Sequence, residues 1–251
     1  MRVVWGRARG ALAEPVPMGA AFAWGVVAAS SLVLGMLLGL ARSWPSRLIG
    51  LVLAFGAGAL ISAVSFELFE EGIKVGGAAA VGIGLAGGAL VYFVLARLVE
   101  RRTPKDAGGG TALALGAFLD GVPEQIVLGI GIAAGQGVSI GLLGAIFVSN
   151  LPEAVGSATD MRASGSSTRQ IRLLWLAVAG LCALATPLGY LAAKHTGGHF
   201  QALINGFAAG ALLVMLVDSM IPEATEKSGR AAGLATTLGF AVAAGLSTAT
   251  A

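Results

Sequence analysis

The chain has 251 residues, of which 56% are hydrophobic and 12% charged, and its mean hydropathy is +0.86. So little polar surface excludes a soluble globular protein and indicates an integral membrane protein. A formal net charge of only +3 gives no basis for nucleic-acid binding, and the single cysteine, Cys182, excludes a disulfide framework.

Eight apolar segments are each long enough to cross a bilayer, whose hydrocarbon core needs about 20 residues of helix. They cover residues 18–40, 47–69, 75–99, 111–134, 137–160, 171–193, 200–221 and 230–250. The connections between them are short. We therefore expect one all-α transmembrane domain over residues 1–251, with no soluble module attached.

The basic residues orient this bundle. With loops alternating between the two sides, one side carries eleven of the 16 Lys and Arg residues and the other carries five. Cytoplasmic loops usually hold the excess. We therefore expect a multi-pass protein of the cell (plasma) membrane with both termini outside, although the three arginines before the first span alone favour the opposite orientation.

A weak internal repeat relates the second and seventh spans. Residues 55–60 match residues 207–212 at an offset of 152, and Glu71 then corresponds to Glu223. These two spans run in opposite directions in the expected topology. This is the pattern of an inverted repeat, here arranged as three, two and three spans, and such folds are typical of secondary transporters.

Spans four and five each carry a proline and a glutamate in the middle of an apolar run. The sequences are Asp120-Gly121-Val122-Pro123-Glu124 and, 29 residues later, Ser149-Asn150-Leu151-Pro152-Glu153. Residues four apart share one helix face, and each proline leaves a backbone carbonyl without its helical donor. We therefore expect the two motifs to meet at mid-depth as an oxygen-rich cluster.

Ionisable side chains inside a membrane are costly and usually mark a functional path. Asp120, Glu124 and Glu153 cannot all stay ionised at close range unless a cation or protons join them. Together with Ser149 and Asn150 they predict a site for a metal ion, a proton or both. The structural alternative is that these groups are protonated or hydrogen-bonded and only hold the helices together.

These residues resemble the ZIP (Zrt- and Irt-like) family of divalent metal transporters, in a bacterial form with a divergent metal site. The resemblance lies in the eight spans, the two Pro-Glu motifs, the stretch Thr186-Pro187-Leu188-Gly189 in span six, and the Gly- and Ala-rich starts of spans two and seven. It implies metal ligands at Asp120, Gly121 and Glu124 in span four. In span five it implies Asn150 and Glu153, with Ser149 and Thr186 as auxiliaries.

Several positions depart from the family pattern. The family motif in span four reads His-Asn-x-Pro-Glu-Gly, and here Asp120 stands for the histidine and Gln125 for the last glycine. Ser149 replaces a second histidine, and Thr186 replaces a glutamate. Because oxygen ligands suit manganese, magnesium, calcium or ferrous iron better than zinc, we expect a harder cation than zinc, or one ion rather than a two-metal centre.

Other polar residues have weaker interpretations. Glu67 and Asp218 are candidates for lining the transport path, whereas a solvated helix end is the simpler interpretation for Glu70 and Glu71. His195 and His199 flank a Gly pair and are interpreted as ordinary loop histidines.

We therefore expect a ZIP-like secondary transporter that moves a divalent cation (zinc, manganese, iron or similar) into the cytoplasm. The bilayer and the metal are its expected partners, a homodimer is a possible assembly, and no cofactor is expected to be permanently bound. The absence of zinc-protease, Gly-x-Gly-Asp and phosphate-loop motifs argues against an enzyme. Two alternatives stay open: a transport-silent relative acting as a membrane sensor or interaction subunit, and a carrier or channel for another solute.

Overall fold

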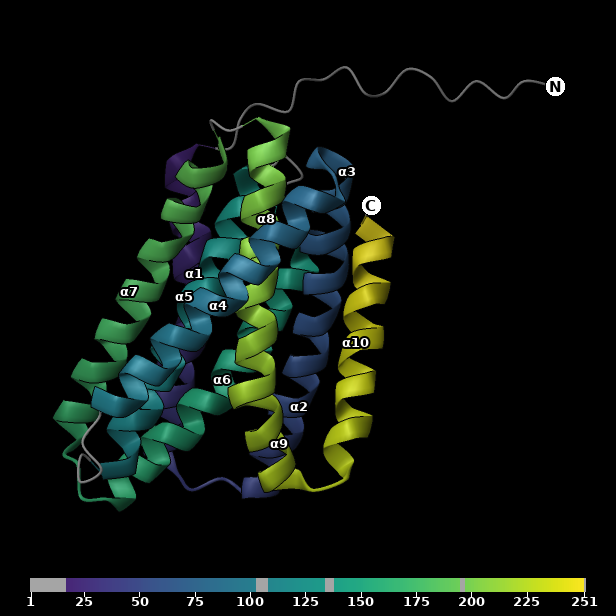
Figure 1. Cartoon of the computed structure of the whole chain (residues 1–251). Helices are drawn as coiled ribbons and strands as arrows, with labels where there is room; N and C mark the ends of the chain where they lie inside the picture. Colours follow the sequence, from purple (N-terminus) through teal and green to yellow (C-terminus); the bar gives the residue numbers. More distant parts are fainter. Residues whose placement is uncertain (1–16, 103–107, 134–137, 195–196, 251) are drawn as a thin grey trace.

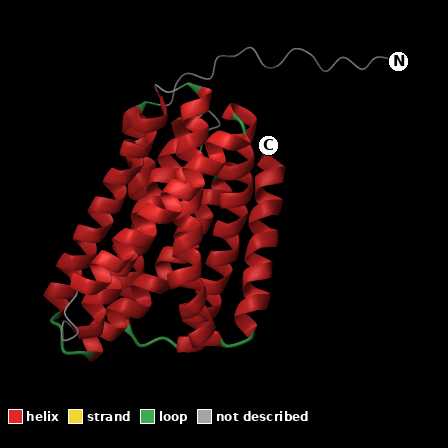
Figure 2. Ribbon diagram, in the orientation of Figure 1, coloured by secondary structure: helices red, strands yellow, loops and turns green. Residues whose placement is uncertain are grey.

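The computed structural model describes residues 17–102, 108–133, 138–194 and 197–250, and all regular secondary structure in these ranges is helical (Figure 2). Eight helical segments follow one another along the described residues, and two of them contain a π-helical stretch. The bounds are α1 (Met18–Ala41), α2 (Ser46–Ala63), η1 (Val64–Glu70), α3 (Glu71–Gly76), α4 (Ala78–Arg102), α5 (Gly108–Ala133), α6 (Ile140–Ala163), α7 (Thr168–Lys194), α8 (Gly198–Met215), η2 (Leu216–Met220), α9 (Ile221–Ser228) and α10 (Ala231–Thr250). Helices α2, η1 and α3 form one rod, as do α8, η2 and α9.

The predicted class, an all-α integral membrane protein, is confirmed. Within the described residues, six helices are long and apolar enough to span a membrane: α1, the α2–α3 rod, α4, α6, α7 and the α8–α9 rod. A shorter apolar helix covers Ala231–Ser247. That all eight segments cross the bilayer, as one transmembrane domain, stays a prediction.

The helices alternate in direction between two ends of the bundle (Figure 1). We call the end where α1 begins and α10 ends the termini end, and the opposite end the basic end. Arg42, Arg47, Arg162, Arg169 and Arg230 lie in or beside the connections at the basic end. This is the end that the charge distribution predicts to be cytoplasmic.

Large apolar side chains cover much of the outer surface, as lipid requires. Leu234 is 78% exposed, Ile83 67% and Leu188 63%. In a bilayer this surface needs no covering, whereas the backbone polar groups must be paired internally, which helices achieve. The interior contains many alanines, such as Ala21, Ala28 and Ala57, beside larger apolar side chains such as Trp175 and Leu32.

The contact between α5 and α7 depends on two glycines. A Cβ built on Gly129 would lie 2.0 Å from the Thr186 carbonyl oxygen, and one built on Gly189 would lie 2.2 Å from the Ile126 carbonyl oxygen. The two backbones therefore touch, as small residues allow in membrane bundles. This contact fixes the position of α5, which carries the first Pro-Glu motif.

The sequence repeat has a structural counterpart. The π-helical stretches η1 and η2 begin at Val64 and Leu216, which are equivalent positions at the offset of 152. The two rods that contain them pack together and run in opposite directions (Figure 1). Because π-helical turns insert an extra residue and often occur at functional sites, the matched stretches direct attention to the side chains around them.

We predict that Gly189→Ala destabilises the fold, because the new methyl group would overlap the Ile126 carbonyl. Overpacking of this kind typically costs about 1–3 kcal/mol. The measurement is thermal unfolding of the purified protein in detergent. The matched control is Gly180→Ala on the same helix, where a Cβ would have nothing within 4 Å; it should leave stability unchanged or raise it by about 0.5–1 kcal/mol. Equal melting temperatures for the two variants would contradict the close α5–α7 contact.

Candidate metal site between helices α5 and α6

Glu124 joins the two Pro-Glu motifs. Its carboxylate accepts hydrogen bonds from Ser149 Oγ at 3.1 Å and from Asn150 Nδ2 at 3.0 Å. All three residues are at most 1% exposed, and they lie near the middle of α5 and α6. The structure thus brings the central residues of the two motifs into direct contact, as their register predicts.

Asp120 lies one turn before Glu124 on α5 and is held from two other helices. Ser219 of η2 donates a hydrogen bond to Asp120 Oδ2 at 3.0 Å, and the hydroxyl of Tyr92 on α4 donates to Oδ1. Both carboxylate oxygens therefore have a neutral donor. Neither Tyr92 nor Ser219 was predicted, because a single tyrosine or serine in an apolar helix has no signal of its own.

A small cavity of about 10 Å³ lies beside these carboxylates. It is lined by Leu53, Asp120, Glu124, Glu153, Met215, Ser219, Met220 and Glu223. We call it the inner cavity. A single water needs roughly 10–15 Å³, so the space fits at most one small species.

The fourth carboxylate at the inner cavity belongs to Glu223 of α9. It forms an ion pair with Lys227 one turn later, at 2.7 Å, with both side chains about one fifth exposed. The sequence singled out Glu223 only as the repeat equivalent of Glu71. Its position on a different span hid its proximity to Asp120 and Glu153.

The carboxylates are not arranged as a finished metal cage. Among the described residues, no group of three or more His, Cys, Asp or Glu side chains is placed to hold a metal ion. One oxygen is nevertheless without a partner: Asn150 Oδ1 is buried and accepts no hydrogen bond. Buried acceptors are nearly always paired, so this amide oxygen is available to a ligand.

Thr186 lies in a separate network. Its hydroxyl donates to Gln125 Oε1, and Gln125 Nε2 donates to the Gly25 carbonyl oxygen at 3.4 Å. Thr186 and Gln125 are fully buried, and neither lines the inner cavity. This network ties α1, α5 and α7 together behind the carboxylates.

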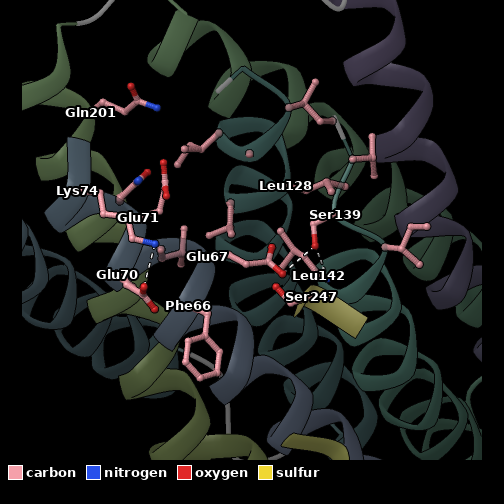
Figure 3. A pocket seen from close by; sticks show the side chains of 18 of the residues that line it. Phe66, Glu67, Glu70, Glu71, Lys74, Leu128, Ser139, Leu142, Gln201 and Ser247 are labelled. Carbon is pink, nitrogen blue, oxygen red and sulfur yellow. Dashed lines mark hydrogen bonds and ion pairs between the residues drawn. The ribbon is translucent and has the colours of Figure 1, made fainter. Parts of the chain in front are cut away.

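A much larger cavity of about 710 Å³ lies near the termini end, where it is lined by residues of η1, α3, α5, α6, α8 and α10. Figure 3 shows its lining side chains. We call it the outer cavity. Glu67 lies on its wall, where it accepts a hydrogen bond from Ser139 Oγ at 2.7 Å. Asp218, the other residue predicted to line the path, is exposed and lines neither cavity.

Equivalent positions of the internal repeat line the two cavities. Adding 152 to the numbers of Glu67, Leu68 and Glu71, which line the outer cavity, gives Ser219, Met220 and Glu223, which line the inner cavity. Subtracting 152 from Asn205 of the outer cavity gives Leu53 of the inner cavity. Each cavity thus combines the π-helical stretch of one rod with a residue from the partner rod. Equivalent positions are open at one end of the bundle and closed at the other.

Comparison with known proteins finds a similarity to a plant protein. No family model matches the chain. Over 189 residues it is 28% identical to a protein of Arabidopsis thaliana that is named as a putative zinc transporter. The match covers 71% of this chain and 30% of the relative, so the chain spans less than a third of that protein's length.

We predict that Thr186→Val destabilises the protein, because it would leave the buried Gln125 Oε1 without its donor. An unsatisfied buried acceptor costs about 1–3 kcal/mol. Thermal unfolding would measure the loss, and Thr186→Ser, which keeps the hydroxyl, is the control. In a double-mutant cycle, Gln125→Leu should remove most of the effect of Thr186→Val; strictly additive losses would show that the pair does not interact.

Proposed function

We propose that the chain is a ZIP-like secondary transporter that moves a divalent metal cation across the membrane and into the cytoplasm. The observation that carries this proposal is the set of buried carboxylates beside the unpartnered Asn150 Oδ1, halfway along α5 and α6. The similarity to a relative named as a zinc transporter supports the same function. Membership of the ZIP family is part of the proposal.

Asp120, Glu124, Asn150 and Glu153 are the proposed ligands. Metal ligands must be deprotonated and free of competing donors. Binding would therefore require the Glu124 carboxylate to exchange its bonds from Ser149 and Asn150 for the cation. Asn150 would then present its oxygen, and Ser149 would remain a neighbouring hydroxyl that supports either arrangement.

The two cavities support alternating access. The outer cavity is wide, while the inner cavity is nearly closed, and buried apolar side chains such as Ile146 and Leu212 lie between them along α6 and α8. In inverted-repeat transporters, rocking of one repeat against the other exchanges such open and closed halves around a central site. We propose that the termini end is outside and that rocking moves these apolar side chains aside, so that an ion in the outer cavity can reach the site.

One observation favours the alternative of a transport-silent relative. Both oxygens of Asp120 and both oxygens of Glu124 already accept hydrogen bonds from neutral donors. A satisfied polar network of this kind can stabilise a bundle without any ion. The two functions therefore differ in whether the network opens to a cation.

We predict that proteoliposomes containing the protein take up a divalent metal and that Glu124→Ala combined with Glu153→Ala abolishes this uptake. The test uses a panel that includes Zn²⁺, Mn²⁺ and Fe²⁺. Glu226→Ala is the matched control, because Glu226 is exposed on α9 and lines neither cavity. No uptake of any metal by a folded and inserted wild type would favour the silent relative.

We also predict that the site favours harder cations than a histidine-containing site would. Imidazole selects zinc and other late transition metals. Asp120→His should therefore raise the affinity for Zn²⁺ relative to Mn²⁺. Competition between the two metals on purified protein measures the ratio. A wild-type site that depends on Asp120 and already strongly selects Zn²⁺ would contradict the prediction.

A further inference from the structure

The outer cavity has an acidic wall. Glu67, Glu70 and Glu71 come from the same rod, and Lys74 is the only basic residue among the described residues that line the cavity (Figure 3). Lys74 pairs with Glu70 at 2.8 Å, and both side chains are more than half exposed. Glu67 and Glu71 are half-buried and line the cavity, and among the described residues neither forms an ion pair, although the charge of Lys74 also acts on Glu71. The wall therefore retains negative charge after the one ion pair is formed.

Asn205 adds an independent sign of a ligand. It is only 3% exposed, lines the same cavity, and its Oδ1 has no hydrogen-bond partner. Its Cβ lies 3.2 Å from where a Cβ of Gly72 would be, so the amide packs directly beside the turn that carries Glu71. A buried amide oxygen next to a carboxylate attracts a cation or a water bound to one.

The internal repeat allows Asn205 to be compared with its equivalent at the inner cavity. Its equivalent at the inner cavity is Leu53, which is apolar, while Glu71 is the equivalent of Glu223. At the inner cavity, Glu223 is neutralised by Lys227. At the outer cavity, an amide oxygen replaces the leucine, and among the described residues Glu71 forms no ion pair, because Lys74 is paired with Glu70. The equivalent positions are thus adapted to attract a cation at one end only.

We propose that Glu67, Glu71 and Asn205 form a second binding site, for a hydrated divalent cation, in the outer cavity. A divalent ion with six waters occupies about 200 Å³, taking about 30 Å³ per water, and the cavity is about 710 Å³. The ion therefore enters with its water shell, as oxygen-rich sites with few protein ligands allow. The site is occupied independently of the one between α5 and α6, and it rests on the proposed function for the identity of the ion.

The test is Mn²⁺ binding to the full chain in neutral detergent, with free Mn²⁺ measured by electron paramagnetic resonance. Glu124→Gln combined with Glu153→Gln removes the deeper ligands, and this variant should still bind one Mn²⁺ per chain. Adding Asn205→Leu and Glu67→Gln should weaken that binding by roughly 10–100-fold, the range found even for residues one shell beyond a metal's ligands. Glu226→Gln in the same background is the matched control and should retain binding, because Glu226 is exposed on α9 and lines neither cavity.

Asn205→Asp guards against a variant that merely fails to fold. It adds a carboxylate at the same place and should tighten Mn²⁺ binding. The proposal is overturned if the deep-site variant binds no Mn²⁺, or if Asn205→Asp and Asn205→Leu bind alike. If the site between α5 and α6 binds no metal, the result is different. The wild type and the deep-site variant would then each bind one Mn²⁺ per chain, and Asn205→Leu would weaken binding in both.

Discussion

Burial of carboxylates within an apolar bundle is the constraint on which the rest of this structure depends. An ionisable group in hydrocarbon must find donors, a counter-ion or a proton. Asp120 and Glu124 find four neutral donors, and these come from three other parts of the chain: α4, α6 and η2. Satisfying two side chains of α5 therefore fixes how the central helices meet. The same hydrogen bonds would have to be replaced by bonds to the ion when it binds. The residues of the polar network are therefore also the residues of the proposed transport site.

The repeat explains how one arrangement can serve two ends of the bundle. η1 and η2 start at equivalent positions, and each contributes a polar residue, Glu67 or Ser219, to a cavity shared with the other rod. The protein is not symmetric in detail, since Ser219 stands for Glu67 and Leu53 for Asn205. Equivalent residues thus occupy equivalent places in the two cavities, but they differ in charge and polarity. The outer cavity, at the termini end, is therefore lined by the acidic residues Glu67 and Glu71, whereas Glu223, nearer the basic end, is paired with Lys227.

Hydropathy and motif spacing could predict much of this. The all-α membrane class follows from composition, and the contact between Glu124 and the pair Ser149 and Asn150 follows from two motifs, each about one helical turn long, on neighbouring helices. What the sequence could not indicate were partners that carry no pattern. Tyr92 is one aromatic residue in an apolar helix, and Ser219 one hydroxyl near a helix break. Both become visible only when tertiary packing brings α4 and η2 to Asp120.

The departures from the ZIP pattern at Gln125 and Thr186 are linked rather than independent. The family has a small glycine at the first position and a glutamate at the second, whereas here the two larger and neutral groups hydrogen-bond to one another. Thr186 thereby faces the α1–α5–α7 interface, away from the inner cavity, and Gln125 occupies the space that glycine would leave. Where the family pattern has a glutamate, this chain has a hydrogen-bonded neutral pair that connects the helices. The carboxylate lost at Thr186 is balanced by the one gained at Asp120, so it is the cavity volume of about 10 Å³ that supports the expectation of a single ion, because a second cation would lack the space to share the site.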